Sequence, residues 1–246
     1  LLITILAFGA GMSLFALLGG VLVFLPDWVF ERSLQPLVAF AAGSLIGGAF
    51  FHMMPHAMMG AASPHVFMMW VVAGFTAVFA LDQLLEWRQF HNAQEAAVRP
   101  LGPLLLAADG LHNLVGGLAI GAIFLTDVRA GLAAWLAAAL HEIPQEIGDF
   151  GALVHSGYSR VQALLYNFIS ALAFPLGSGI AYFLGQGVDV YFFVAIGAGS
   201  FLYIAAADLI PEVKRARRLR GALARFLFFA MGVGLLYVPV ALLVPQ

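Results

Sequence analysis

The chain has 246 residues and a formal net charge of −2, and 63% of its residues are hydrophobic while only 10% are charged. Soluble domains are about 45–50% apolar and about 25% charged, so this composition excludes a soluble fold and predicts a polytopic protein in a lipid bilayer, with no nucleic-acid partner. There is no cysteine, which excludes disulfides and thiolate metal ligands.

Eight apolar segments, each about long enough to cross a bilayer, follow one another along the chain. They cover roughly residues 2–25, 36–58, 66–86, 101–125, 131–154, 161–184, 189–211 and 222–244. The first is too long for the apolar core of a signal peptide, so we interpret it as a span. The connections are short. The sequence therefore predicts one all-α transmembrane domain over residues 1–246.

Basic residues lie almost entirely on one side of these spans. Of the eleven Lys and Arg residues, ten follow spans one, three, five and seven, and only Arg129 lies on the other side. Because basic loops remain in the cytoplasm, we expect a multi-pass protein of the plasma or inner membrane with both termini outside. We interpret the basic run at 214–220 as this topological anchor.

The second and seventh spans share a pattern at a constant separation of 156 residues, as from His52 to Asp208. The matching segments are Ala42-Gly43-Ser44 with Ala198-Gly199-Ser200, and His52-Met53-Met54-Pro55-His56 with Asp208-Leu209-Ile210-Pro211-Glu212. Because the two spans run in opposite directions, the pattern predicts an inverted repeat, spans 1–3 and 6–8, around a central pair of helices.

The repeat places one pair of polar side chains near each membrane face, at i, i+4 spacing on one side of a helix. We expect His52 and His56 to lie on the outer access path of an ion, and Asp208 and Glu212 on the inner one. A structural interpretation stays open for each pair: histidines at the interface, and carboxylates paired with Lys214 or Arg215.

The fourth and fifth spans carry polar side chains at their centres. Asp109, His112, Asn113 and Gly116 fall within an arc of about 100° on span four, and His141, Glu142, Gln145, Glu146 and Asp149 within about 140° on span five. Three unpaired carboxylates at membrane depth would cost roughly 9 kcal/mol, at about 3 kcal/mol each. No Lys or Arg lies at that depth, so we expect a mobile cation to balance them.

The two polar stripes are expected to face one another, because a short turn joins the spans. Gly116 and Gly117 would let the two backbones approach closely. Pro144 is expected to make span five irregular and to expose the Leu140 carbonyl beside a cavity.

Imidazole, carboxylate and amide groups together suit zinc, and also cadmium, iron or manganese, better than calcium or magnesium. The predicted ligands are His112, His141 and Glu142, with Asn113 and Gln145 as weaker donors. Glu146 and Asp149 would line the inward route, and Asp109 is placed on the ion path.

Four motifs resemble the ZIP family of zinc and iron transporters over nearly the whole chain. They are Asp109-Gly110-Leu111-His112-Asn113 with Gly117-Leu118-Ala119-Ile120-Gly121, then His141-Glu142-x-Pro144-x-Glu146-x-Gly148-Asp149, His52-x-x-Pro55-His56-Ala57, and Leu202-Tyr203-Ile204 with Asp208-x-x-Pro211-Glu212. The second is similar to the motif of one branch of the family.

The resemblance implies a transporter rather than an enzyme, with no catalytic cofactor and a divalent metal ion as substrate. It further implies eight helices in a 3+2+3 arrangement, a homodimer, elevator-like movement, and metal flow into the cytosol between spans four and five. Gly116 replaces the acidic residue usual in the family and Gln145 the second His of the branch, which favours one bound metal over two.

Two other functions fit parts of the pattern. His141-Glu142 suggests an intramembrane metalloprotease, but that motif needs His four residues after the first, where Gln145 stands. A proton or alkali-cation pathway without divalent metal would also use the buried carboxylates.

Overall fold

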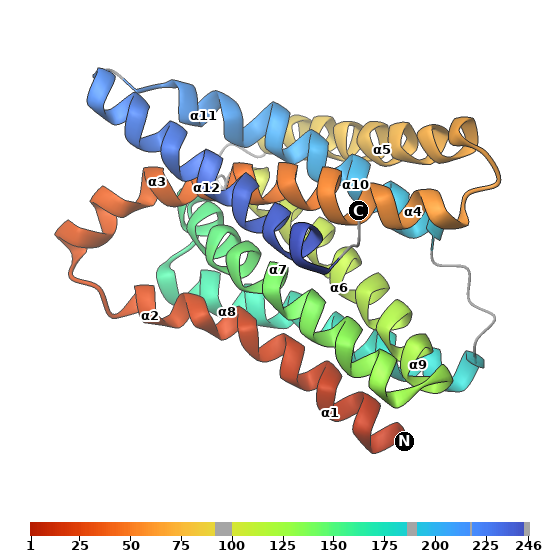
Figure 1. The fold of residues 1–246 in the computed structure, drawn as a ribbon. Coiled ribbons are helices and arrows are strands. Elements are labelled where there is room, and N and C mark those ends of the chain that lie inside the picture. Colours follow the sequence, from red (N-terminus) through yellow and green to blue (C-terminus); the bar gives the residue numbers. More distant parts are fainter. Residues whose placement is uncertain (92–99, 186–190, 217, 244–246) are drawn as a thin grey trace.

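In the computed structural model, residues 1–91, 100–185, 191–216 and 218–243 are described, and helices are the only regular structure among them (Figure 1). The elements are α1 (Leu2–Ser13), a 3₁₀ turn (Leu14–Gly19), α2 (Gly20–Val23), α3 (Asp27–Gly47), a π turn (Gly48–Met53), α4 (Met54–Gly60), α5 (Pro64–His91), α6 (Leu101–Thr126), α7 (Val128–Ser156), α8 (Arg160–Ala171), α9 (Ala173–Leu184), α10 (Tyr191–Tyr203), a second π turn (Ile204–Leu209), α11 (Ile210–Lys214) and α12 (Leu219–Leu243).

Seven helical stretches of the described chain are long and apolar enough to cross a membrane. They are Leu2–Val23, Asp27–Gly60, Pro64–Leu85, Leu101–Thr126, Arg160–Leu184, Tyr191–Lys214 and Leu219–Tyr237. α7 is 29 residues long but carries Glu142, Glu146 and Asp149, and it is not among the seven. The all-α fold is therefore confirmed, and seven of the eight predicted spans meet the criteria of length and composition.

The helices form two groups with α6 and α7 between them (Figure 1). α3 packs on α12 and α10 on α5 in one group, while α9 packs on α1 in the other. α7 contacts α3 on one side and α6 on the other, and α6 also packs along α9. The polar residues of α6 and α7 therefore lie in the interior of the protein.

Glycines set the closest helix contacts. A Cβ on Gly43 of α3 would lie 2.1 Å from the Phe229 carbonyl oxygen of α12, and a Cβ on Gly199 of α10 would lie 2.0 Å from the Val71 carbonyl oxygen of α5. Each helix thus approaches its neighbour backbone to backbone, a contact that any side chain would prevent. Gly43 and Gly199 are equivalent positions of the sequence repeat.

Gly116 and Gly117 were predicted to let α6 approach α7 closely, and the predicted neighbouring helix was wrong. A Cβ on Gly117 would lie 2.0 Å from the Phe174 carbonyl oxygen of α9, and one on Gly116 would lie 3.2 Å from the Phe174 ring. α7 uses its own glycine for close packing, since a Cβ on Gly148 would lie 2.8 Å from Ala41 Cα of α3. The sequence identified a close contact of α6, but the contact is with α9.

Proline has different effects in three helices. Each π turn is followed by a helix with a proline near its start, Pro55 in α4 and Pro211 in α11. Proline cannot donate the hydrogen bond that an α-helix requires, and a widened turn precedes each of these two prolines. The two turns are separated by the same number of residues as the two halves of the sequence repeat. Pro144, by contrast, is buried within α7, which is α-helical on both sides of it, so no π turn accompanies this proline. Packing on α3 and α6 outweighs a cost of about 3 kcal/mol.

α8 has a well-defined start, which matters because it carries side chains into the site. Ser159 and Gln162 form a reciprocal capping box. Arg160 donates to the Leu25 carbonyl at 2.7 Å and to Asp27 Oδ1 at 2.8 Å. These contacts fix the beginning of α8 against the end of the first span.

Candidate transport site

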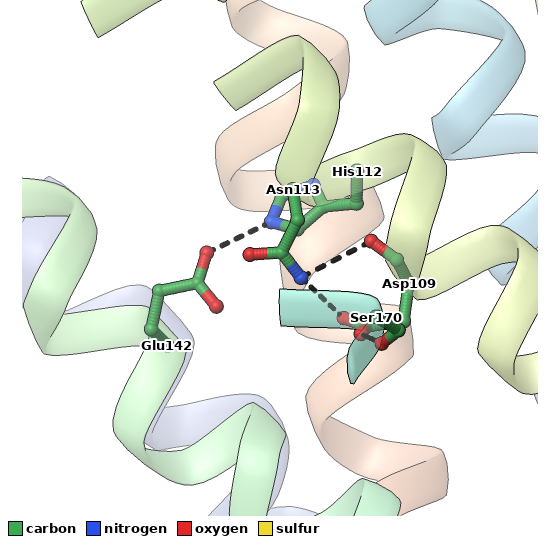
Figure 2. Close-up of polar contacts among 5 residues, drawn as sticks. All are labelled: Asp109, His112, Asn113, Glu142 and Ser170. Atoms are coloured by element: carbon green, nitrogen blue, oxygen red, sulfur yellow. Dashed lines mark hydrogen bonds and ion pairs between the residues drawn. The ribbon is translucent and has the colours of Figure 1, made fainter. Parts of the chain in front are cut away.

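His112 of α6 and Glu142 of α7 meet in the centre of the protein. His112 Nε2 lies 3.1 Å from Glu142 Oε1 (Figure 2), and the two residues are only 7% and 2% exposed. A single residue, Asp127, separates the two helices, so α7 returns alongside α6 and the two polar stripes come together at this point, as the periodicity predicted.

Asp109 and Asn113 are joined to one another on the same face of α6. Asn113 Nδ2 donates to Asp109 Oδ1 at 2.9 Å and to the Asp109 carbonyl at 3.1 Å. Ser170 of α8 donates to Asp109 Oδ2. This leaves the Asn113 carbonyl oxygen pointing toward Glu142 (Figure 2), where it can act as a metal ligand.

A third helix, α8, contributes polar side chains to the site, and these residues were not predicted from the sequence. Asn167 of α8 is fully buried, and its Nδ2 donates to Glu146 Oε2 at 2.5 Å. Ser170 lies three residues later on the same helical face and holds Asp109. A buried Asn within an apolar span was the available signal, since polar groups inside membranes are costly unless they have partners.

Gln145 and Asp149 are each 1% exposed. The Gln145 amide nitrogen and both Asp149 carboxylate oxygens have no hydrogen-bond partner among the described residues. Burying a charged or polar group without a partner is unfavourable, so the Asp149 carboxylate can take part in binding a cation, whereas the Gln145 amide N–H needs an acceptor.

The side chain of His141, a predicted ligand, lies outside the described residues, although its backbone belongs to α7. Within the described part, no three His, Asp or Glu side chains are grouped closely enough to hold a metal ion. Among the described residues, the candidate site therefore centres on the pair His112–Glu142.

His112 and Glu142 form part of the lining of a cavity of about 250 Å³. Its lining includes His52 and His56 together with His112, Glu142 and Gly116, and most of its remaining wall is apolar. The rings of His52 and His112 are 6.5 Å apart between centroids. The predicted outer histidines are thus brought to the same cavity as the central pair, whereas the described lining does not include Glu146 or Asp149.

Of the predicted inner pair, Glu212 lies beside the C-terminal end of α7. Glu212 Oε2 is 3.6 Å from Nε2 of His155, a residue that the sequence analysis did not single out, and Glu212 Oε1 is 2.7 Å from Arg215 Nη1. Asp208 belongs to the π turn that precedes α11 and is partly buried. The pairing of Glu212 with Arg215 fits the structural alternative, while the contact with His155 connects Glu212 to the helix that carries Glu142.

An all-helical membrane protein with histidine and carboxylate side chains buried between its spans has the features of a cation transporter. A family model described as ZIP Zinc transporter matches residues 88–239, and the chain belongs to this ZIP family. Family members are metal transporters and not enzymes, which confirms the expectation that the chain is not an enzyme.

Similar proteins are named for metal transport. The chain is 31% identical over 216 residues to Zinc transporter ZIP13 of Pongo abelii, covering 81% of this chain and 65% of the relative. It is 41% identical over 142 residues to mouse Zinc transporter ZIP4, covering 57% of this chain and 21% of the relative. It is 40% identical over 115 residues to zebrafish Metal cation symporter ZIP14, covering 47% of this chain and 23% of the relative. The match thus spans about a fifth of the longer relatives.

Proposed function

We propose that the chain takes up zinc, carrying the ion from outside into the cytoplasm through the contact of α6 with α7. The observation that carries this proposal is the buried pair His112–Glu142, which lines a cavity together with His52 and His56. Relatives named as zinc transporters support the choice of substrate. Cadmium, iron and manganese are compatible with the same ligand types.

The distance between the central pair suits a shared ion. Ligands about 2.0–2.2 Å from a tetrahedral zinc lie roughly 3.3 Å from each other, and His112 Nε2 is 3.1 Å from Glu142 Oε1. We propose that His141, Asn113 and Gln145 complete the ligand set. Beyond it, the ion would pass Glu146 and Asp149, and then Asp208 and Glu212.

The architecture that we propose has eight spans in a 3+2+3 arrangement, with α7 as the fifth. Two observations support the inverted repeat: the π turns Gly48–Met53 and Ile204–Leu209 are 156 residues apart, and Gly43 and Gly199 make equivalent close contacts. An α7 with three carboxylates can cross the membrane because its polar face is enclosed by α3, α6 and α8.

The proposed orientation has both termini outside a plasma or inner membrane. The turns after α2 and α11 lie at one end of the molecule, and the turns after α4 and α6 at the other (Figure 1). Most basic residues belong to the first end, which is the cytoplasmic end by the positive-inside rule. Association into a homodimer and elevator-like movement are proposed from the family resemblance alone.

Uptake by purified protein in vesicles that contain a zinc-sensitive dye tests the function. We expect zinc to enter vesicles that contain the protein faster than protein-free vesicles. A pH-sensitive dye and a potassium-sensitive dye in parallel samples distinguish the alternative. Movement of protons or potassium without any zinc would contradict the proposal and favour a pathway for monovalent cations.

Gly116→Asp is expected to tighten zinc binding at the central pair or to add one more bound ion beside it. Gly116 lines the cavity beside the central pair, and only the Phe174 ring, 3.2 Å from the new Cβ, would have to shift. The added carboxylate would therefore reach the ion. Calorimetric titration measures both quantities, with Gly116→Asn as the uncharged control. The same stoichiometry and affinity as the unaltered protein would contradict this role of Gly116.

A further inference from the structure

The cytoplasmic end of α7 carries a histidine that the proposed function has not used. His155 is one residue before the end of the helix, yet its side chain is only 8% exposed, and Glu212 opposite it is 16% exposed. At 1.5 Å per residue, His155 lies about 20 Å along α7 from Glu142. The two pairs therefore lie far apart on one helix.

We propose that His155 and Glu212 form a second, weaker divalent-cation site at the inner end of the ion path. This inference rests on the proposed function and names the place from which the ion is released. His155 Nε2 and Glu212 Oε2 are 3.6 Å apart, slightly beyond a good hydrogen bond. The separation is close to the roughly 3.3 Å between two ligands of one tetrahedral zinc.

Arg215 would compete with a cation for the Glu212 carboxylate. Its Nη1 lies 2.7 Å from Glu212 Oε1, and its side chain is 72% exposed. An exposed ion pair contributes little and is easily broken, so an arriving divalent ion can displace the guanidinium into solvent. Arg225 of α12 donates to the carbonyls of Glu212 and Val213, at 3.2 Å each, which holds the α11 backbone in position during the exchange.

The donor set explains why this second site should bind weakly. Imidazole and carboxylate suit the same borderline metals as the central pair, but only two such groups meet here in the described part of the chain, so water would supply the other ligands. Sites on a transport path must release their ion. A weak site about 20 Å further along α7 is consistent with release into the cytoplasm.

Calorimetric titration of the full chain in lipid nanodiscs with zinc tests this inference. The unaltered protein should bind two zinc ions with different affinities. His155→Ala should lose the weaker ion and keep the tighter one, whereas Glu142→Gln should lose the tighter one. His155→Asp keeps an oxygen ligand, so it should retain the second ion. Arg215→Gln should tighten the weaker site about two- to fivefold, because it removes a competing surface pair.

The inference is overturned if His155→Ala binds two ions as the unaltered protein does, or if Arg215→Gln leaves the weaker affinity unchanged. His155→Asp that loses the ion while remaining folded would count equally against it. Zinc uptake into vesicles by the unaltered protein distinguishes a failure of the second-site inference from a failure of the proposed function. One-ion binding with uptake contradicts only the second site, whereas absence of uptake contradicts the proposed function.

Discussion

Replacing Glu142 with Gln is expected to abolish zinc uptake while the protein remains folded. The amide has the size of the carboxylate and can still accept a hydrogen bond from His112, so packing around this residue is preserved. It lacks the negative charge that balances a divalent ion at membrane depth. Loss of a group that only hydrogen-bonds a metal ligand costs about 10- to 100-fold in metal affinity or activity. Loss of a ligand itself should cost at least as much.

Vesicle uptake measured at several zinc concentrations checks this expectation. Glu31→Gln, the same change at an exposed position of α3, is the matched control and should transport normally. Circular dichroism establishes that both variants are helical. If Glu142→Gln transports zinc at the normal rate, the central pair is not on the ion path.

Gly117→Ala is expected to destabilise the protein strongly and to reduce uptake indirectly. The new Cβ would lie 2.0 Å from the Phe174 carbonyl oxygen, and a backbone atom can move aside only if α6 and α9 separate. Overpacking of this kind typically costs about 1–3 kcal/mol, and occasionally more. Separation of the helices would also shift His112, because it lies on the same helix five residues earlier.

Thermal unfolding in detergent, followed by circular dichroism, measures this effect. Gly110→Ala on the same helix is the control, since its Cβ would come no closer than 3.9 Å to the nearest neighbour, Ser170 Cβ. Alanine also favours a helix over glycine by about 1 kcal/mol, so this control should be as stable as the unaltered protein or more so. Equal unfolding temperatures for the two variants would show that the α6–α9 contact tolerates a side chain.

Helical periodicity predicted which faces of α6 and α7 carry polar groups, and the contact of His112 with Glu142 followed from the short turn between the helices. Periodicity does not determine which helix packs on a given face. That choice depends on the shapes of all the helices together, which is why Gly117 was assigned to the wrong neighbour and why Asn167 and Ser170 of α8 were missed.

Contacts between distant parts of the chain were the hardest to predict. His155 is an isolated histidine in the sequence, and only the folded chain brings it to Glu212. The repeat was easier, because a constant separation is visible in the residues themselves. The structure adds that the two prolines of the repeat, Pro55 and Pro211, each follow a π turn, whereas Pro144 lies within an uninterrupted α-helix.

The central claim is that a divalent ion binds between α6 and α7. Anomalous diffraction from crystals of the protein soaked in zinc or cadmium tests it most directly. The strongest anomalous peak should lie about 2.0–2.2 Å from His112 Nε2 and from Glu142 Oε1 for zinc. Peaks confined to exposed residues, with none between the two helices, would contradict the claim.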